Sequence, residues 1–403
     1  MIWGVSVKKN VSLKNAVIAI IVTNLITVSL LVFAPIPMIG GMKLVTGQEY
    51  DFLKKFGKMI TVKNLVMDRY VDKIDMQKMV DGALRGMVSN ATDIYTEYMD
   101  EKEFKEWTTQ TKGSYAGIGV YIEPKDGRIM VVSPIEDGPA QRAGIKSGDI
   151  ILKINGQEMT ADDMNKAVSM MTGKEGKKIN LIIYRSGVGN KEFNLITEKI
   201  VFKTVKSKIL NNNIGYIRIT QFTETTGNDF NKALDSLLDK KIKGLVLDLR
   251  DNPGGLLTEC VKVADRLVGE GTIVYTIDNK NQREEWTSDE NKINIPLALL
   301  VNEGTASASE IVSGAVRDYK AGTLIGTKTF GKGLVQDLID LRDGTGIKIT
   351  IARYYTPSGE CIQGKGITPD IILTLPEKDK YKELKLEEDI QLQKAIQVIK
   401  SKM

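Results

Sequence analysis

One serine and one lysine of this chain, Ser307 and Lys332, could form a hydrolytic site, and the chain contains no histidine. Without histidine, a Ser-His-Asp triad, a Cys-His pair and an H-E-x-x-H zinc helix are all excluded. A serine nucleophile then needs another base, and a lysine can serve when burial lowers its pKa toward neutrality. The sequence therefore predicts Ser-Lys nucleophilic catalysis, with Lys332 taking the proton of Ser307.

Ser307 and Lys332 could also have purely structural roles, but a third segment favours a catalytic role for them. Ser307-Ala-Ser-Glu310 matches the capping box S/T-x-x-E, and Lys332 lies in a glycine-rich turn. The segment Asp248–Gly255, however, follows a buried strand, and its two glycines let the backbone approach a ligand and expose an amide. Three such loops on one sheet would gather a hydroxyl, an amine and free amides, which is the set that acyl transfer needs.

An alternation of strands and helices is expected to position these loops. From about residue 201 we predict helices at 226–239, 256–267 and 307–318, and strands at 214–219, 244–249, 273–277, 297–301 and 323–326. This rhythm is typical of an α/β domain with a largely buried sheet. A charged amphipathic helix is expected at about 387–400.

The first half of the chain differs in texture. Apolar residues at helical spacing over about 45–106 predict a small helical region, which either packs on the body or acts as an arm for a homodimer. Short β-type runs and two short helices over about 111–198 predict a compact β-rich module.

The N-terminal segment suggests a location. Residues 16–34 are uncharged and apolar over a length that can cross a bilayer, and Lys8, Lys9 and Lys14 precede them. The positive-inside rule then predicts a single-pass signal anchor, with the catalytic part outside the cytoplasmic membrane. A cleaved signal peptide, which would give a secreted form, is the alternative.

Composition excludes several other classes. With 56 Lys+Arg against 51 Asp+Glu the net charge is +5, and no basic stripe interleaved with aromatics occurs, so no nucleic-acid partner is expected. The two cysteines, Cys260 and Cys361, form no metal-type cluster, so neither a metal nor a cofactor is expected. Export would permit a disulfide between them, but two free thiols are the expected state.

Several motifs in order resemble those of the carboxy-terminal processing proteases, the tail-specific PDZ serine proteases of peptidase family S41. The resemblance extends from about Asp81 to the C-terminus, and beyond the Ser307 and Lys332 segments its motifs are Asp81–Met87, Asp93–Thr96, Gly117–Val120, Gly138–Gly144, Asp248–Gly255 and Pro357–Asp370. It implies a crotonase-like α/β protease core with an inserted β-rich PDZ domain. The implied domains are an anchor at 1–40, a helical region at 41–110, the PDZ domain at 111–198, the protease core at 199–376 and a helical segment at 377–403.

The resemblance also assigns roles to single residues. It makes Ser307 the nucleophile, Lys332 the general base and Gln336 the residue that holds the lysine amine, while the amides of Ala308 and Gly254 form the oxyanion hole, with Gly255 as the alternative to Gly254. Glu310 would be an auxiliary carboxylate or only a helix cap.

The PDZ domain would read the substrate. Backbone amides at Gly117, Ile118, Gly119 and Val120 would hold the free C-terminal carboxylate of a protein or peptide, and the domain would gate the active site. Many members have Arg-Gly where this chain has Thr172-Gly173, so an arginine that couples the two domains is not at its usual place. The alternatives to this function are a peptide-binding scaffold without turnover and a cytoplasmic hydrolase.

Overall fold

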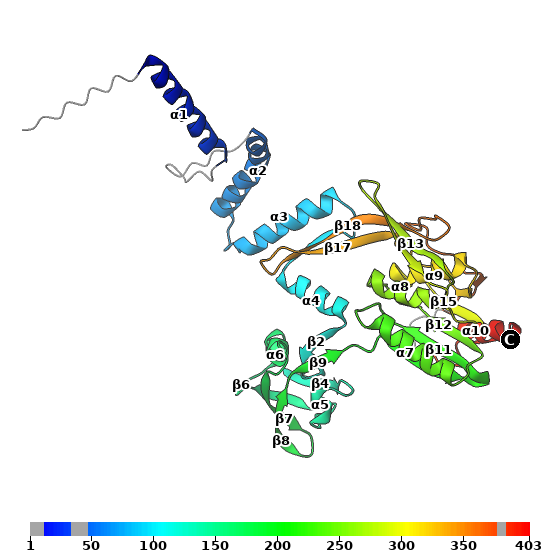
Figure 1. Ribbon diagram of the computed structural model, residues 1–403. Coiled ribbons are helices and arrows are strands. Elements are labelled where there is room, and N and C mark those ends of the chain that lie inside the picture. Colours follow the sequence, from blue (N-terminus) through cyan, green and yellow to red (C-terminus); the bar gives the residue numbers. More distant parts are fainter. Residues whose placement is uncertain (1–11, 34–46, 377–383) are drawn as a thin grey trace, which may run out of the picture. The chain divides into compact units, whose positions relative to one another are not determined.

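The structure is a computed structural model that describes residues 12–33, 47–376 and 384–403, in two compact units, Met1–Met79 and Val80–Met403 (Figure 1). Helix α1 (Leu13–Phe33) forms within the apolar N-terminal run. Across the described residues, however, no helix has the length and apolar character needed to cross a membrane, so the predicted transmembrane helix is not supported. Residue 34 and the basic residues before Ser12 lie outside the described residues.

Helices form in the region predicted to be helical: α2 (Gly47–Arg69), α3 (Met76–Ala91) and α4 (Glu101–Lys112). Asp100 caps α4 in a capping box with Glu103, and Gly113 ends it in the left-handed region at a φ of 64°. Apolar side chains of α2, among them Ile60 and Leu65, are exposed. The homodimer through this region stays a prediction.

The predicted β-rich module forms between α4 and the α/β domain that begins with β10. Its main sheet has the order β3-β4-β5-β7-β8, with β6 paired to β5, and β2 and β9 form a separate pair. A hydrophobic core that includes Ile129, Ile151 and Leu181 fills it. The strands are β2 (Ser114–Gly117), β3 (Val120–Lys125), β4 (Arg128–Pro134), β5 (Ile150–Ile154), β6 (Gln157–Glu158), β7 (Lys178–Arg185), β8 (Gly189–Ile196) and β9 (Glu198–Val201), and the helices are α5 (Pro139–Arg142) and α6 (Met164–Met171).

A six-stranded sheet of order β10-β11-β12-β15-β16-β19 carries the predicted α/β domain. Only the β10–β11 pair is antiparallel, and β12 and β15 are buried along their whole length, as expected for parallel strands covered on both faces. The strands are β10 (Val205–Leu210), β11 (Ile214–Ile219), β12 (Gly244–Asp248), β15 (Leu297–Val301), β16 (Thr323–Gly326) and β19 (Ile371–Ile372).

Helices cover both faces of this sheet (Figure 1). Helices α7 (Thr226–Asp239), α8 (Leu257–Asp265) and α9 (Ala308–Asp318) pack on one face, and α10 (Ile390–Ser401) packs on the other through Leu392, Ala395 and Ile399. Because β12 and β15 are parallel neighbours, their carboxyl ends meet at one edge, and the Asp248 and Ser307 loops leave from that edge.

A second sheet packs on helices α8 and α9 and supports the lysine loop. Its central strand β18 (Gly346–Tyr355) pairs with β1 (Glu97–Met99), with β13 (Gly271–Asp278) and with β17 (Leu334–Asp340), and β14 (Arg283–Ser288) pairs with β13. Strand β1 precedes the β-rich module in sequence, so the two segments flanking that module meet in this second sheet. Cys260 and Cys361 are free thiols, as expected.

Candidate active site

Ser307 occupies a strained turn between β15 and α9. Its φ of 54° and ψ of −118° lie in a region that residues other than glycine rarely adopt. Such a conformation costs about 1–3 kcal/mol and persists only where the surroundings impose it. Here they do: the buried Tyr354 hydroxyl donates to the Ser307 carbonyl at 3.1 Å, and the Ser307 amide donates to Glu310 at 2.9 Å. The turn fixes the half-buried Ser307 at the start of the helix.

Glu310 joins the serine and lysine segments. One carboxylate oxygen accepts hydrogen bonds from the Ser307 amide and the Lys332 amide, each at 2.9 Å. The other accepts from the Gly331 amide at 2.8 Å and from the Thr329 hydroxyl. Burial raises the pKa of this fully buried carboxyl above its ordinary value, although the four donors act in the opposite direction. The carboxylate therefore aligns two loops rather than merely capping a helix.

Lys332 is partly buried, and its ammonium nitrogen lies 4.8 Å from the centroid of the Tyr95 ring. Within the described residues that nitrogen forms no hydrogen bond or ion pair. Burial, followed by the positive charge of Lys348, lowers the pKa of Lys332, while Asp93 and Glu97 act to raise it. A lysine with a lowered pKa is what a general base requires.

Gln336 contacts Thr350 on the neighbouring strand. Its side-chain amide nitrogen lies 3.4 Å from the Thr350 hydroxyl, and the two residues are cross-strand partners of β17 and β18. Thr350 also donates its backbone amide to the Thr96 hydroxyl at 3.1 Å, next to Tyr95. The structure thus brings Gln336 to the strand that supports the Tyr95 segment, with no direct bond to Lys332 among the described residues.

The glycine turn after β12 lies directly against Ser307. A Cβ atom on Gly254 would stand 2.8 Å from the Ser307 Cβ and 2.9 Å from the Ala308 nitrogen, and Gly254 has a φ of 101°, so only glycine fits here. The Gly254 amide, however, donates to the Asn252 side chain at 2.9 Å. The amides of Ala308 and Gly255 form no hydrogen bond with any described residue.

Asn252 is a residue that sequence reasoning missed. It is fully buried, its side chain donates to the Ile219 carbonyl at 2.9 Å, and its carbonyl accepts from the Ala306 amide at 3.0 Å and the Ser309 hydroxyl at 3.1 Å. It therefore ties the glycine turn to both sides of Ser307. The Asn-Pro-Gly-Gly run was its only signal in the sequence.

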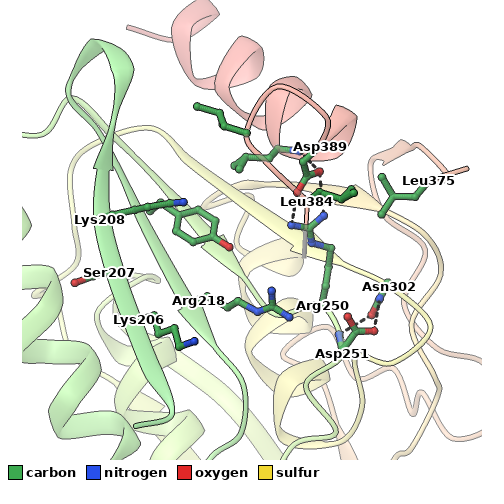
Figure 2. Close-up of a pocket in the computed structure, with 13 residues that line it drawn as sticks. Lys206, Ser207, Lys208, Arg218, Arg250, Asp251, Asn302, Leu375, Leu384 and Asp389 are labelled. Atoms are coloured by element: carbon green, nitrogen blue, oxygen red, sulfur yellow. Dashed lines mark hydrogen bonds and ion pairs between the residues drawn. The ribbon is translucent and has the colours of Figure 1, made fainter. Parts of the chain in front are cut away.

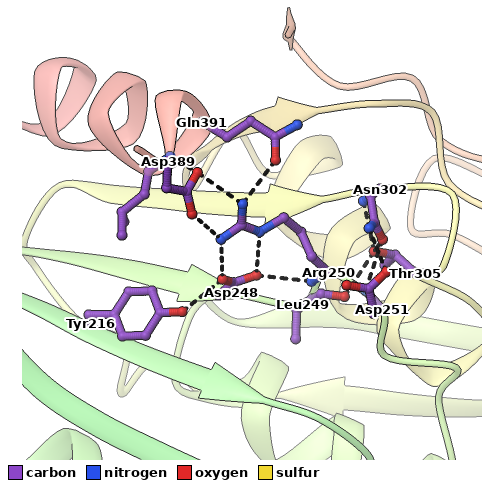
Figure 3. Close-up of polar contacts among 10 residues, drawn as sticks. Tyr216, Asp248, Leu249, Arg250, Asp251, Asn302, Thr305, Asp389 and Gln391 are labelled. Atoms are coloured by element: carbon purple, nitrogen blue, oxygen red, sulfur yellow. Dashed lines mark hydrogen bonds and ion pairs between the residues drawn. The ribbon is translucent and has the colours of Figure 1, made fainter. Parts of the chain in front are cut away.

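A buried ionic network at the end of β12 was missed as well (Figure 3). The Arg250 guanidinium bonds Asp248 at 2.6 Å and Asp389, which precedes α10, at 2.7 Å, and Tyr216 donates to Asp248 at 2.8 Å. Burial alone would raise the pKa of Asp248, but the Arg250 charge and hydrogen bonds hold it below its usual value. Distant segments meet here, which no local sequence pattern reveals.

The predicted peptide-binding loop at Gly117–Val120 is mostly buried. The Ile118 amide donates to the Met171 carbonyl at 3.2 Å, and its carbonyl accepts from the Ala140 amide at 2.9 Å. Within the described part of the chain the Gly119 amide has no hydrogen-bond partner. Gly117 forms an isolated bridge with Thr172. Across those same residues no group of three or more Cys, Asp or Glu side chains is placed to hold a metal ion.

Comparison with known proteins gives a consistent assignment. The model of peptidase family S41 matches residues 213–373, that of a PDZ domain residues 130–185 and that of the activating protease CtpB N-terminal domain residues 42–103.

Similar proteins match over most of their length. The carboxy-terminal processing protease CtpA of Bacillus subtilis is 40% identical over 80% of this chain and 70% of its own. The carboxy-terminal-processing protease of Bartonella bacilliformis is 39% identical over 86% and 81%, and CtpB of B. subtilis is 34% identical over 84% and 72%. The chain therefore belongs to the carboxy-terminal processing proteases of peptidase family S41, which are serine-type peptidases, and it carries a PDZ domain.

Proposed function

We propose that Ser307 and Lys332 form a catalytic dyad that cleaves proteins whose C-terminal tails bind to the PDZ domain. The observation that carries this proposal is the buried Glu310 carboxylate, which accepts from the backbone amides of both residues. A carboxylate in this position fixes the nucleophile loop relative to the lysine loop. The lowered pKa of Lys332 adds the chemical property that a base needs.

In the proposed reaction, neutral Lys332 takes the hydroxyl proton as the Ser307 oxygen attacks the scissile carbonyl. The lysine then gives this proton to the leaving amine, and water hydrolyses the acyl-enzyme ester. The unpaired Ala308 and Gly255 amides are the proposed oxyanion donors, since Asn252 already occupies the Gly254 amide. Gln336 would hold the Lys332 amine only after its side chain turns from Thr350.

The proposed tail reader is the Gly117–Val120 loop. Its unpaired Gly119 amide is available to a substrate carboxylate, whereas the Ile118 amide must first release the Met171 carbonyl. Tail binding would therefore compete with an internal hydrogen bond.

The decisive experiment compares cleavage of an unfolded protein that ends in a free apolar C-terminus with cleavage of the same protein amidated at that end. Ser307→Ala and Lys332→Ala should both lose turnover, and amidation should raise KM in the parent. Lys328→Ala, which removes an exposed lysine from the same loop, is the matched control and should keep full activity. Turnover that survives Ser307→Ala would refute the dyad, and tail binding without any turnover would leave only a peptide-binding scaffold.

We further propose that the processed proteins lie outside the cytoplasm, a location for which the support is the apolar composition of residues 16–34. Alkaline phosphatase, which folds only outside the cytoplasm, fused after Met403 should be active in cells. An inactive fusion that is expressed to a normal level would contradict this location.

A further inference from the structure

A cavity of about 190 Å³ lies beside the ionic network, on the face of the sheet β10-β11-β12-β15-β16-β19 that α10 covers (Figure 2). Its walls come from β10 and β11, from the loops that follow β12 and β15, and from the segments after β19 and around the start of α10. Neither Ser307 nor Lys332 lines it, so the proposed catalytic site does not account for it. Its volume corresponds to about six water molecules at about 30 Å³ each.

Two cations on its wall are direct neighbours, and among the described residues neither is in a salt bridge. Lys206 on β10 and Arg218 on β11 are direct cross-strand partners, a like-charge arrangement that destabilises a sheet. Within the described ranges, neither side chain forms an ion pair or hydrogen bond, and the Arg218 Nε atom is buried without a partner. Leaving such a buried donor unsatisfied carries a desolvation cost.

The carboxylates near the cavity already form hydrogen bonds or ion pairs with other side chains. Asp248 and Asp389 both bond Arg250, and Asp251 accepts from the Asn302 side chain at 2.7 Å (Figure 3). Arg250 bonds two acids, and one of them, Asp248, also interacts electrostatically with Arg218. Neither Lys206 nor Arg218, however, has a hydrogen-bond acceptor of its own among the described residues. The wall therefore favours an anion from outside the described chain.

Protection of a sheet edge explains only part of this pattern. Lysines on an edge strand such as β10 prevent pairing with another chain, and Lys206 and Lys208 fit that role. Arg218 does not, because it lies on the second strand, where β10 and β12 already occupy both edges. Protection of the sheet edge therefore does not explain why Arg218 lies here with an unpartnered Nε atom.

The opposite side of the cavity is apolar. Leu375, Leu384, Leu386 and Leu392 line it, so an inorganic anion would leave this side without a partner. We propose that the cavity binds a carboxylate carried on a short aliphatic group, with the carboxylate at Arg218 and Lys206 and the aliphatic part on the leucines. This chemistry is shared by the last residue of a peptide and by a small aliphatic acid.

The test uses the full chain with labelled methyl groups, titrated with N-acetyl-leucine, with hexanoate and with the uncharged N-acetyl-leucinamide. Saturable shifts of the Leu386 and Leu392 methyl resonances report the cavity, and those of Ile118 report the PDZ loop. One or both acids should shift the leucine resonances and the amide should not. N-acetyl-leucine alone would identify a peptide end as the source, and hexanoate alone would identify an aliphatic acid.

Variants separate this site from the PDZ domain. Arg218→Gln and Lys206→Gln should each raise the dissociation constant measured from the leucine resonances about tenfold or more, because each removes a charged donor. Neither variant should change the response of the Ile118 resonance. Arg128→Gln is the matched control, because this exposed arginine of β4 forms no ion pair with any described residue. The proposal fails if neither acid shifts the leucines, if Arg218→Gln binds as the parent does, or if inorganic phosphate saturates the site equally well. Loss of cleavage in Ser307→Ala is independent of all three outcomes.

Discussion

The ammonium of Lys332 lies over the ring of Tyr95, 4.8 Å from its centroid. This contact stabilises the charged lysine, as do the carboxylates of Asp93 and Glu97, whereas burial and Lys348 favour the neutral form. The same Asp93 accepts the backbone amides of Tyr95 and Thr96 at 2.9 Å, which holds the ring in place. Tyr95 is therefore a positioning residue whose influence on the base can be measured.

We expect Tyr95→Leu to extend activity to lower pH. Loss of the ring destabilises the ammonium by about 0.5–1 kcal/mol, so a larger fraction of Lys332 is neutral, and kcat/KM on the acidic limb of the pH profile should rise about two- to fivefold. Tyr95→Phe keeps the ring and should keep the parent profile. A limb that moves equally in both variants would show that the hydroxyl, and not the ring, acts on the lysine.

Glu310→Gln should lower kcat by about tenfold or more and the free energy of unfolding by about 1–3 kcal/mol. The amide nitrogen of glutamine donates, so one pair of the four present donors would lose its acceptor in a buried place. Steady-state kinetics and urea unfolding measure the two effects. Glu303→Gln, on the exposed part of the same loop, is the comparison, and an equal loss of kcat there would contradict a special role for Glu310.

Gly254→Ala should reduce kcat about 10²–10³-fold, because the added methyl group would displace Ser307 and the oxyanion amides. Gly364→Ala separates this clash from backbone strain. Gly364 also has a positive φ, of 70°, but nothing lies within 4 Å of its added Cβ. It should lose stability and keep most of its turnover, and equal losses of kcat in the two variants would point to strain alone.

Asp389→Ala should lower the free energy of unfolding by about 3–5 kcal/mol, because Arg250 would lose one partner of a buried ionic network. Glu387→Ala, which changes an exposed neighbour, should leave the free energy of unfolding nearly unchanged.

The depressed pKa of Asp248 makes the stability depend on pH. The contribution of Asp248 to the free energy of unfolding is full above its unfolded pKa of about 3.9 and is lost as pH falls through the lower folded value. Chemical denaturation at several pH values measures both effects.

The sequence predicted the protease core well where burial is continuous. Strands β11, β15 and β16 and helix α7 have the predicted bounds, because runs such as Leu297–Val301 are apolar on both faces and glycines or polar residues end them. The transmembrane helix was predicted from an uncharged apolar run and the lysines before it, and it is not supported.

Sequence motifs identified which residues of the candidate site to expect, but they did not predict which side chains contact one another. The positions of Ser307, Lys332 and Gly254 followed from the motifs, whereas the contact of Tyr95 with Lys332 joins segments on either side of the β-rich module. The Arg250–Asp389 pair likewise joins residues far apart in sequence. Such contacts depend on strand pairing between distant segments, which single-sequence periodicity does not encode.

Residues of one strand, β18, contact or act on most of the residues of the candidate site. Tyr354 near one end donates a hydrogen bond to the Ser307 carbonyl. Thr350 in the middle contacts the Gln336 side chain and the Thr96 hydroxyl. The positive charge of Lys348 lowers the pKa of Lys332. A shift in the register of this strand would displace Ser307, Lys332 and the residues that position them at once. Catalytic competence would therefore behave as an on–off property of one strand register instead of a sum of independent side-chain adjustments.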